Sequence, residues 1–424
     1  MDFIKRQITE VQFGGRSALV RKARRALKLL PRVLAVVFAV PCLIVIRMIR
    51  PWLLVRIGGL ISGRIGHFAA NTELYLCERE AGLNRPTQRH VDVFYMRSEP
   101  VCNEQLATMW RRELNCWPAW FVSPIAWLNQ LIPGGAIHDV LDRTTALDIY
   151  NLLDRFPPHL QFTAEEVARG EADLLRMGIP VGAPFVCLIV RDSAYLDSQA
   201  DRGDWCYHRY RDSDIGNYAL VAEQLAERGY HVVRMGAKVN SSFDVRHPRV
   251  IDYATNGLRS DFMDIYLGAK CTFCISTGTG WDAIPEMLRR PIVYVNLVPL
   301  AYLHTFRADF LSITKKHVNE KNGKILSVRD IFQTGAAYSL DAADFVSKGV
   351  KLVENTPEEI RDAAFEMVAR LDGTWRAGIE DEILQETFWN IFSANLGEHS
   401  NQLHGDIRAR YGAAFLRDNP AWLQ

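Results

Sequence analysis

The pattern of apolar and polar positions becomes regular after about residue 180. Short continuous apolar runs predict strands over 185–190, 231–235, 249–253, 271–276 and 292–295. Helical periodicity between them predicts helices over 215–228, 261–269 and 281–288. Continuous apolar strands that alternate with helices indicate a parallel, doubly wound sheet. We therefore expect an α/β domain in the second half of the chain.

The region before residue 180 is patterned more weakly. Residues 91–96 are rich in β-formers and predict one strand, and a capping box opens a predicted helix over 163–176. Residues 106–132 are rich in tryptophan, which fits a packed core, an interfacial belt or an acceptor cleft. Glycine and proline are dense over 178–184, so we place a domain boundary there.

Residues 1–62 join a basic segment to an apolar one. The basic segment holds nine cations: Lys5, Arg6, Arg16, Arg21, Lys22, Arg24, Arg25, Lys28 and Arg32. The apolar run that follows, Val33 to Ile46, has 14 residues and is shorter than the ~20 of a membrane span. Arg47, Arg50 and Arg56 then recur at roughly helical spacing, which fits a segment that lies in the membrane interface with snorkelling cations.

We expect residues 1–62 to be a membrane-anchoring segment, with the body of the protein on the cytoplasmic side, because basic flanks stay there. A buried amphipathic helix is the alternative. Nucleic-acid binding by the basic segment is disfavoured because that segment abuts an apolar run. No small-residue cleavage site follows the run, which argues against a secretory signal peptide.

Length and composition describe a folded protein of two or three domains. The chain has 424 residues, of which 48% are hydrophobic and 23% charged, with a net charge of +1. Its eight cysteines are scattered, and the one C-x-x-C pair, Cys271 and Cys274, falls in a strand-like run. Neither a zinc site nor a disulfide framework is predicted, and the pattern suits a reducing cytosol.

The loop after the strand 271–276 is the first candidate for chemistry. It comprises Ser276, Thr277, Gly278, Thr279 and Gly280, and a predicted helix follows it. Small residues between a parallel strand and a helix N-terminus leave backbone N–H groups free for an anion such as a phosphate or diphosphate.

Cationic side chains follow two neighbouring strands. Arg191 comes after the first strand, and Arg234 and Lys238 lie at and beyond the end of the second. Since the carboxyl ends of parallel strands share one edge, we expect these three cations to clamp a diphosphate beside the loop, with no metal needed. The alternative is that they are surface salt-bridge partners.

Carboxylates and one further cation complete the candidate donor site. Asp282 and Glu286 lie one turn apart behind the loop and are candidates for binding a ribose or donor sugar, although they also suit the dipole of a helix N-terminus. Arg211 and Asp212 are further candidates for the crevice, whereas the adjacent Ser213 or Asp214 serves better as a helix N-cap.

His67 is the candidate catalytic base. It lies in a glycine-containing loop of the first half, and an imidazole is suited to accept a proton near neutral pH. A lone histidine is more often structural, and the sequence leaves that alternative open.

Several of these segments together resemble a bacterial glycosyltransferase family. The likeness rests on His208-Arg-Tyr-Arg-Asp-Ser-Asp-Ile215, Gly229-Tyr-His-Val-Val-Arg-Met-Gly236 and Ile275-Ser-Thr-Gly-Thr-Gly280. Arg64-Ile-Gly-His-Phe68 and Ile46-Arg-Met-Ile-Arg-Pro51 are similar too, so the resemblance covers most of the chain.

This resemblance implies a GT-B-like α/β fold, in which two Rossmann-like domains face each other behind the membrane-associated segment. It implies an acceptor-side domain over 63–180, a nucleotide-sugar domain over 181–375, and C-terminal helices over 376–424 that pack back on the N-terminal domain. Such enzymes transfer a sugar from a nucleotide-diphosphate donor, with no cofactor and no catalytic metal. The expected acceptor is a cell-surface polysaccharide or a lipid-linked molecule at the cytoplasmic face of the bacterial inner membrane.

Two other functions remain open on the sequence. One is a nucleotide-sugar epimerase or hydrolase on the same scaffold, which would have no need of an anchor. The other is a non-catalytic envelope assembly protein that retains a degenerate nucleotide pocket.

Overall fold

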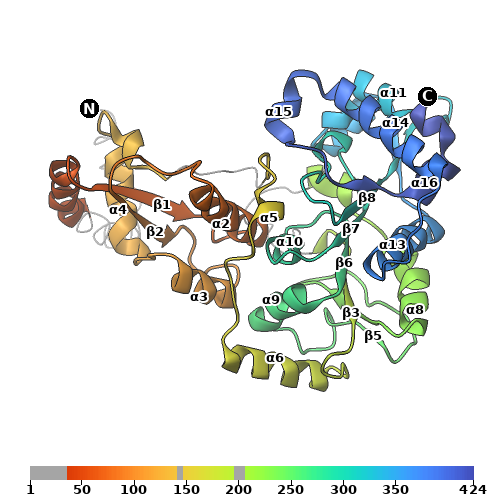
Figure 1. The fold of residues 1–424 in the computed structure, drawn as a ribbon, viewed down its shortest axis with the longest axis horizontal. Helices are drawn as coiled ribbons and strands as arrows, with labels where there is room; N and C mark the ends of the chain where they lie inside the picture. The colour runs from red at the N-terminus through yellow and green to blue at the C-terminus, as the bar shows by residue number, and fades with distance from the viewer. Residues whose placement is uncertain (1–35, 141–146, 195–205) are drawn as a thin grey trace, which may run out of the picture. The chain divides into compact units, whose positions relative to one another are not determined.

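The computed structural model describes residues 36–140, 147–194 and 206–424, which form two compact units (Figure 1). Of the described residues, 36–63, 84–101 and 110–140 belong to the first unit, and all others belong to the second. The predicted domains are contiguous ranges, whereas these units are discontinuous. The predicted basic cluster, Lys5 to Arg32, lies outside the described residues.

The first unit is a small parallel α/β layer. Strand β1 (Leu54–Leu60) pairs in parallel with β2 (His90–Met96), and α3 (Glu104–Glu113), which follows β2, belongs to the first unit only from Trp110 onward. A helix over 36–49, α4 (Ala119–Gln130) and the short η1 (Gly135–His138) complete the unit. Its core is an apolar cluster: Ala39, Leu43, Ile57, Val122, Ile125 and Ala126.

Arg56 does not continue the helical series that was predicted for Arg47, Arg50 and Arg56. It lies in β1 and forms a buried ion pair, with Nη2 2.6 Å from Asp92 Oδ2 and Nε 2.7 Å from Asp92 Oδ1. Leu54 to Leu60 are extended and pair residue by residue with β2, in which Arg56 is opposite Asp92, so the side chain of Arg56 bonds to a strand partner and does not face a lipid surface.

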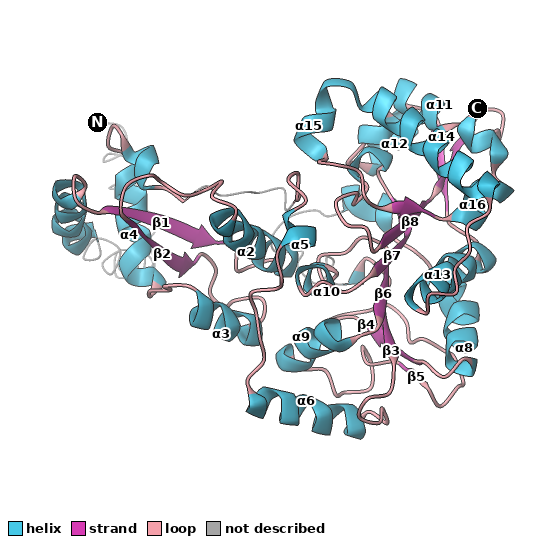
Figure 2. Ribbon diagram, in the orientation of Figure 1, coloured by secondary structure: helices cyan, strands magenta, loops and turns pink. Residues whose placement is uncertain are grey.

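The second unit is built on a seven-stranded parallel sheet, as the apolar runs predicted (Figure 2). The strand order is β11-β8-β7-β6-β3-β4-β5. The bounds are β3 (Phe185–Ile189), β4 (His231–Met235), β5 (Val250–Ile251), β6 (Phe273–Ser276), β7 (Ile292–Leu297), β8 (Phe310–Thr314) and β11 (Arg410–Tyr411). The central strands β3, β4, β6, β7 and β8 are buried throughout, which explains their unbroken apolar character.

Helices cover both faces of this sheet (Figure 1). On one side lie α9 (Asp261–Lys270) and α10 (Ala283–Met287), and on the other α8 (Ala219–Glu227) and α13 (Pro357–Leu371). The predicted cap of α9 is present, because the Ser260 hydroxyl accepts a hydrogen bond from Met263 N–H. The predicted capping box of α6 (Ala164–Arg176) is also present.

The remaining elements extend the second unit. They are α5 (Leu152–Arg155), η3 (Cys206–Arg211), η4 (Ile215–Tyr218), η5 (Leu300–Tyr302), β9 (Lys316–Asn319), α11 (Val328–Gln333), η6 (Ala336–Tyr338), α12 (Ala342–Ser347), β10 (Val350–Val353), α14 (Ile379–Leu396), η7 (Gly397–His399), α15 (Ser400–Leu403), α16 (Ala413–Asp418) and η8 (Pro420–Leu423). Residues 376–424 were expected to pack on the N-terminal domain. They complete the second unit, where β11 pairs with β8 and a buried face of α14 packs, and they also contact the predicted 63–180 range, since Asn151 Nδ2 donates to the Asp406 carbonyl at 2.8 Å.

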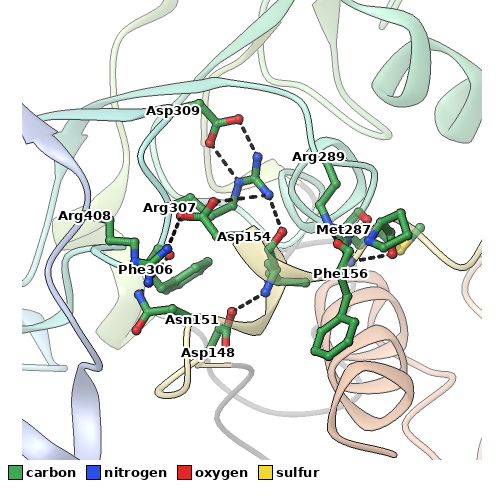
Figure 3. A network of polar contacts seen from close by, with 12 residues as sticks. Asp148, Asn151, Asp154, Phe156, Met287, Arg289, Phe306, Arg307, Asp309 and Arg408 are labelled. Atoms are coloured by element: carbon green, nitrogen blue, oxygen red, sulfur yellow. Dashed lines mark hydrogen bonds and ion pairs between the residues drawn. The ribbon is translucent and has the colours of Figure 1, made fainter. Parts of the chain in front are cut away.

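Helix α2 (Ile65–Glu80) belongs to the second unit although it connects β1 to β2. A buried ion pair fixes it there, with Arg289 Nη2 2.6 Å from Glu73 Oε1. Arg289 has a positive φ of 60° and also donates from Nε to the Phe156 carbonyl at 2.9 Å. Figure 3 shows Arg289 beside Phe156. A second arginine, Arg307, donates from Nη1 to the Leu153 carbonyl at 2.7 Å, three residues before Phe156.

No helix in the described part of the chain combines the length and the apolar character needed to cross a bilayer.

The Glu73–Arg289 pair yields a stability prediction. Arg289→Ala removes the guanidinium from the Glu73 carboxylate, which is 1% exposed and keeps His159 Nδ1 at 3.1 Å, so we expect the free energy of unfolding to fall by about 3 kcal/mol. Arg361→Ala is the matched control, because its ion pair with Asp362 lies at the surface and contributes about 0–1 kcal/mol. Urea unfolding measures both, and equal losses in the two variants would contradict the assignment.

Candidate functional site

The site lies where the strand order of the large sheet changes direction. Strands β3 and β6 are neighbours, but the chain runs from β3 outward to β4 and β5 and returns to β6 on the other side. The loops that follow β3 and β6 therefore diverge and leave a crevice at the carboxyl edge, the usual ligand position in such sheets.

The Ser276–Gly280 loop is held by its own hydrogen bonds. Gly278 N–H donates to Ser276 Oγ at 3.0 Å, and Thr279 N–H donates to Asp282 Oδ2 at 2.7 Å. Thr277 N–H donates to the Ile189 carbonyl of β3 at 3.3 Å. These N–H groups were predicted to face an anion, and in the structure they stiffen the loop instead.

Asp282 and Glu286 point beneath the loop. The Asp282 carboxylate also accepts the Ser276 hydroxyl at 2.7 Å, and its burial raises the pKa of Asp282 to about 6. Glu286 Oε2 lies 3.2 Å from His304 Nδ1 and 3.4 Å from the Tyr294 hydroxyl. Both carboxylates are almost fully buried; Asp282 bonds to the loop, whereas Glu286 bonds to His304 and Tyr294.

Arginine side chains gather above the loop. The backbone N–H of Arg191 donates to Thr277 Oγ1 at 2.9 Å. The Arg191 side chain lies near Asp212, with Nε 3.4 Å from Asp212 Oδ1. Arg211 donates to the carbonyl of Gly278, while its Nε is buried with no hydrogen-bond partner among the described residues. Gly278 has a φ of 74°, and a side chain there would collide with Leu297 at 2.5 Å, so this position requires glycine.

The lowered pKa of His208 indicates a positive electrostatic potential around the arginine side chains. Burial and, after it, the charges of Arg191, Arg211 and Arg64 together lower the pKa of His208 to about 4. Three guanidinium groups are therefore close enough to act on one imidazole. Such a concentration of cations favours an anionic ligand.

The N-terminus of α2 lies against the same loop. A Cβ placed on Gly66 would be 3.0 Å from Gly280 Cα, so a larger residue would push the helix and the loop apart by a few tenths of an ångström. The N-cap residue Arg64 makes no side-chain cap to the helix, and no acidic residue stands in the first turn. The positive end of the α2 dipole thus adds to the arginine cluster. His67 lies in this first turn, partly buried, with Nδ1 3.4 Å from Asn71 Oδ1.

Arg234 and Lys238 do not join this cluster. The Arg234 side chain is buried, and Nη1 lies 3.1 Å from Asp252 Oδ1. Lys238 is exposed in the loop after β4. Their positions at the end of a strand predicted that both cations would lie beside the Ser276–Gly280 loop. The side chain of Arg234 points instead toward Asp252, which follows β5.

A cavity of about 360 Å³ opens beside the cluster. It is lined by Val190, Asp192, Ser193, Asp212, Ser213, Asp214, Ile215, Arg234, Asn240, Ser241 and Glu354. Lys315, which follows β8, donates to the Asp212 carbonyl at 2.5 Å and lies 3.8 Å from Glu354. Sequence reasoning missed Glu354 and Lys315, because they reach the cavity only through tertiary packing. Arg64 could have been found from the sequence, because it directly precedes the helix α2 and so lies at the N-terminus of that helix.

One group of described residues has the spacing of metal ligands: Glu73, Cys77 and His159. Arg289 Nη2 donates both to Glu73 and to the Cys77 sulfur, and so places a cation among the three. Burial and the Glu73 charge raise the pKa of Cys77 to about 12, which keeps the thiol protonated. The group is therefore better suited to its ion pair than to a metal.

No protein-family model matches the sequence, and no curated protein matches it. Among solved structures, it is similar to the ADP-heptose lipopolysaccharide heptosyltransferase II of E. coli, with 15% identity, a TM-score of 0.43, and 75% of this chain and 99% of that chain covered. A glycosyl transferase family 9 protein from Veillonella parvula gives 12% identity and a TM-score of 0.43, covering 74% and 97%.

A third structure, an E. coli heptosyltransferase with ADP-2-deoxy-2-fluoro heptose, gives 11% identity and a TM-score of 0.31, covering 61% and 92%. With TM-scores below 0.5 and identities of 15% or less, these likenesses carry no functional conclusion for this chain.

The buried Asp282 makes the stability of the protein depend on pH. Its pKa is raised from 3.8 to about 6, so the folded state holds this proton more tightly than the unfolded chain does. Its contribution to stability is complete below about pH 4 and is lost as the pH rises through 6, a change of up to about 3 kcal/mol. Asp282→Asn removes this dependence while it retains an acceptor oxygen.

We therefore expect the free energy of unfolding of Asp282→Asn, relative to wild type, to rise by about 3 kcal/mol between pH 4 and pH 7. Urea unfolding at a series of pH values measures the difference. A difference that stays constant over this range would show that Asp282 is not the buried, protonated group.

Proposed function

We propose that the protein is a glycosyltransferase that moves a sugar from a nucleotide-diphosphate donor to a cell-surface polysaccharide or lipid-linked acceptor. The observation that carries the proposal is the convergence of Arg64, Arg191 and Arg211 with the N-terminus of α2 at one crevice. The resemblance of the His208–Ile215 and Ile275–Gly280 segments to a glycosyltransferase family supports it.

The donor diphosphate would lie at this cluster. When the bond between sugar and diphosphate breaks, negative charge grows on the leaving phosphate, and fixed cations stabilise that charge more than they stabilise the ground state. Arg191 and Arg211 are held by the loop and by Asp212, so they need not reorganise during the reaction. In this scheme the arginines supply the positive charge that a metal supplies in other transferases.

The nucleoside would occupy the adjacent cavity. Asp192, Asp212, Asp214 and Glu354 line it, and carboxylates are good acceptors for the hydroxyls of a ribose. Arg234 belongs to this cavity wall and not to the diphosphate clamp. Asp282 would act indirectly, by holding the loop, and Glu286 by holding His304 and Tyr294.

His67 is our proposed base for the acceptor hydroxyl. It stands in the first turn of α2, one residue after the glycine that touches the loop at Gly280. A base placed there would act close to the bond that breaks, as general-base catalysis requires.

Calorimetry with ADP, UDP, GDP, CDP and ADP-heptose tests donor binding. We expect at least one of them to bind, and Arg211→Ala to weaken it by about ten- to a hundred-fold, because a charge-assisted hydrogen bond to phosphate is lost. Lys238→Ala is the matched control and should bind as wild type does. An unchanged circular dichroism spectrum would show that both variants fold.

Binding by none of the five nucleotides would refute the enzyme hypothesis and favour an assembly protein. Binding that is lost in Lys238→Ala but retained in Arg211→Ala would place the diphosphate elsewhere. Hydrolysis or epimerisation of a bound sugar nucleotide, without transfer to any acceptor, would favour the other enzyme classes.

A further inference from the structure

The helix over 36–49 is apolar on two opposite sides. One side, with Ala39 and Leu43, is buried in the core of the first unit. The other side is exposed and comprises Val37, Pro41, Ile44, Val45 and Met48, which recur at helical spacing. Phe38 beside this stripe is 66% exposed. A helix that is apolar all round is normally covered on all sides.

Helix α4 repeats this arrangement next to it. Val122 and Ile125 pack in the same core as Ala39 and Leu43, while Trp120 and Trp127, two turns apart on one face, are exposed. Arg47 Nη2 joins the two helices through a 2.7 Å hydrogen bond to Asn129 Oδ1. Further exposed apolar residues of the first unit are Trp52, Trp117, Leu131, Ile132 and Ile137. We call the exposed stripes of both helices, with these residues, the apolar surface.

Carboxylates are rare in the segments that form this surface; Asp139 is one, and its Oδ1 accepts a hydrogen bond from Asn129 Nδ2 at 3.3 Å. Between Glu10 and Glu73 the sequence contains no acidic residue, and the cations there include Arg47 and Arg50 at the end of the helix. Between Glu113 and Asp139, the segment that carries α4, there is no charged residue at all. Most of the apolar surface can therefore leave water without burying a carboxylate, and Arg47 and Arg50 at the end of the helix attract anions.

We propose that the apolar surface docks the first unit onto an anionic lipid bilayer and lies in the interface without crossing it. Tryptophan is the residue best suited to this depth, since its ring is apolar and its N–H can stay at the headgroups. In the described part of the chain, every tryptophan that is largely exposed lies in the first unit. Cationic flanks add attraction to anionic headgroups.

Charge favours lipid over a second copy of the chain. Self-association through this surface would bring two sets of cationic flanks together, at an electrostatic cost, whereas an anionic bilayer neutralises them. The proposal does not depend on glycosyl transfer, because it concerns the first unit alone and lipid binding is measured without any nucleotide.

The test uses the full chain and vesicles of phosphatidylethanolamine with 30% phosphatidylglycerol, a fraction on the order of that in anionic cell membranes. Phe38→Glu with Met48→Glu places two carboxylates on the exposed stripe, where folding does not depend on the side chain. Ile379→Glu is the matched control, since Ile379 is 85% exposed on α14 of the second unit. Co-sedimentation gives the partition coefficient, and circular dichroism checks folding.

We expect the wild type to bind these vesicles, to bind pure phosphatidylcholine much less, and to show a blue shift of tryptophan emission on binding. The double variant should lower the partition coefficient by about ten-fold or more, and Ile379→Glu should leave it unchanged. No vesicle binding by the wild type, or equal binding by the double variant, would overturn the proposal. So would a change of oligomeric state in the double variant with vesicle binding intact, which would identify a second copy as the occupant.

Discussion

The buried ion pair between Glu73 and Arg289 determines where the candidate site can form. It fixes the middle of α2 to the second unit, and Gly66 then lies about 10 Å further toward the N-terminus of the helix, against Gly280. The ion pair adds to the packing of α2 on α10, the helix that follows this loop. The arginine at its N-cap and the histidine in its first turn reach the crevice for the same reason.

The hydrogen bonds of the Ser276–Gly280 loop show which groups support the loop and which remain available to an anion. The N–H groups of Gly278 and Thr279 are already used inside the loop, and burial of Asp282 is tolerated because it accepts two of the loop's hydrogen bonds. A loop arranged in this way is a rigid support. The attraction for an anion therefore comes from guanidinium groups and from the dipole of α2, with Arg211 linked to the loop through the Gly278 carbonyl.

The sequence predicted the parts of the molecule that depend on local pattern. Five strands and three helices of the large sheet follow from apolar runs, because strands buried on both faces are mostly apolar. The choice of ion-pair partners depends on tertiary packing instead. Arg234 and Arg191 end neighbouring strands, yet Asp252 holds the first and Asp212 the second, and nothing local distinguishes them. The same applies to Glu354, which enters the cavity from a distant part of the chain.

The central claim is that Arg191 and Arg211, beside the first turn of α2, form a diphosphate site. A crystal structure of the protein with the nucleoside diphosphate that binds most tightly tests this most directly. The account predicts phosphate oxygens within hydrogen-bonding distance of both guanidinium groups and of a backbone N–H in the first turn of α2, with the ribose in the cavity lined by Asp192 and Glu354. Phosphates bound at Arg234, or away from this sheet edge, would contradict it.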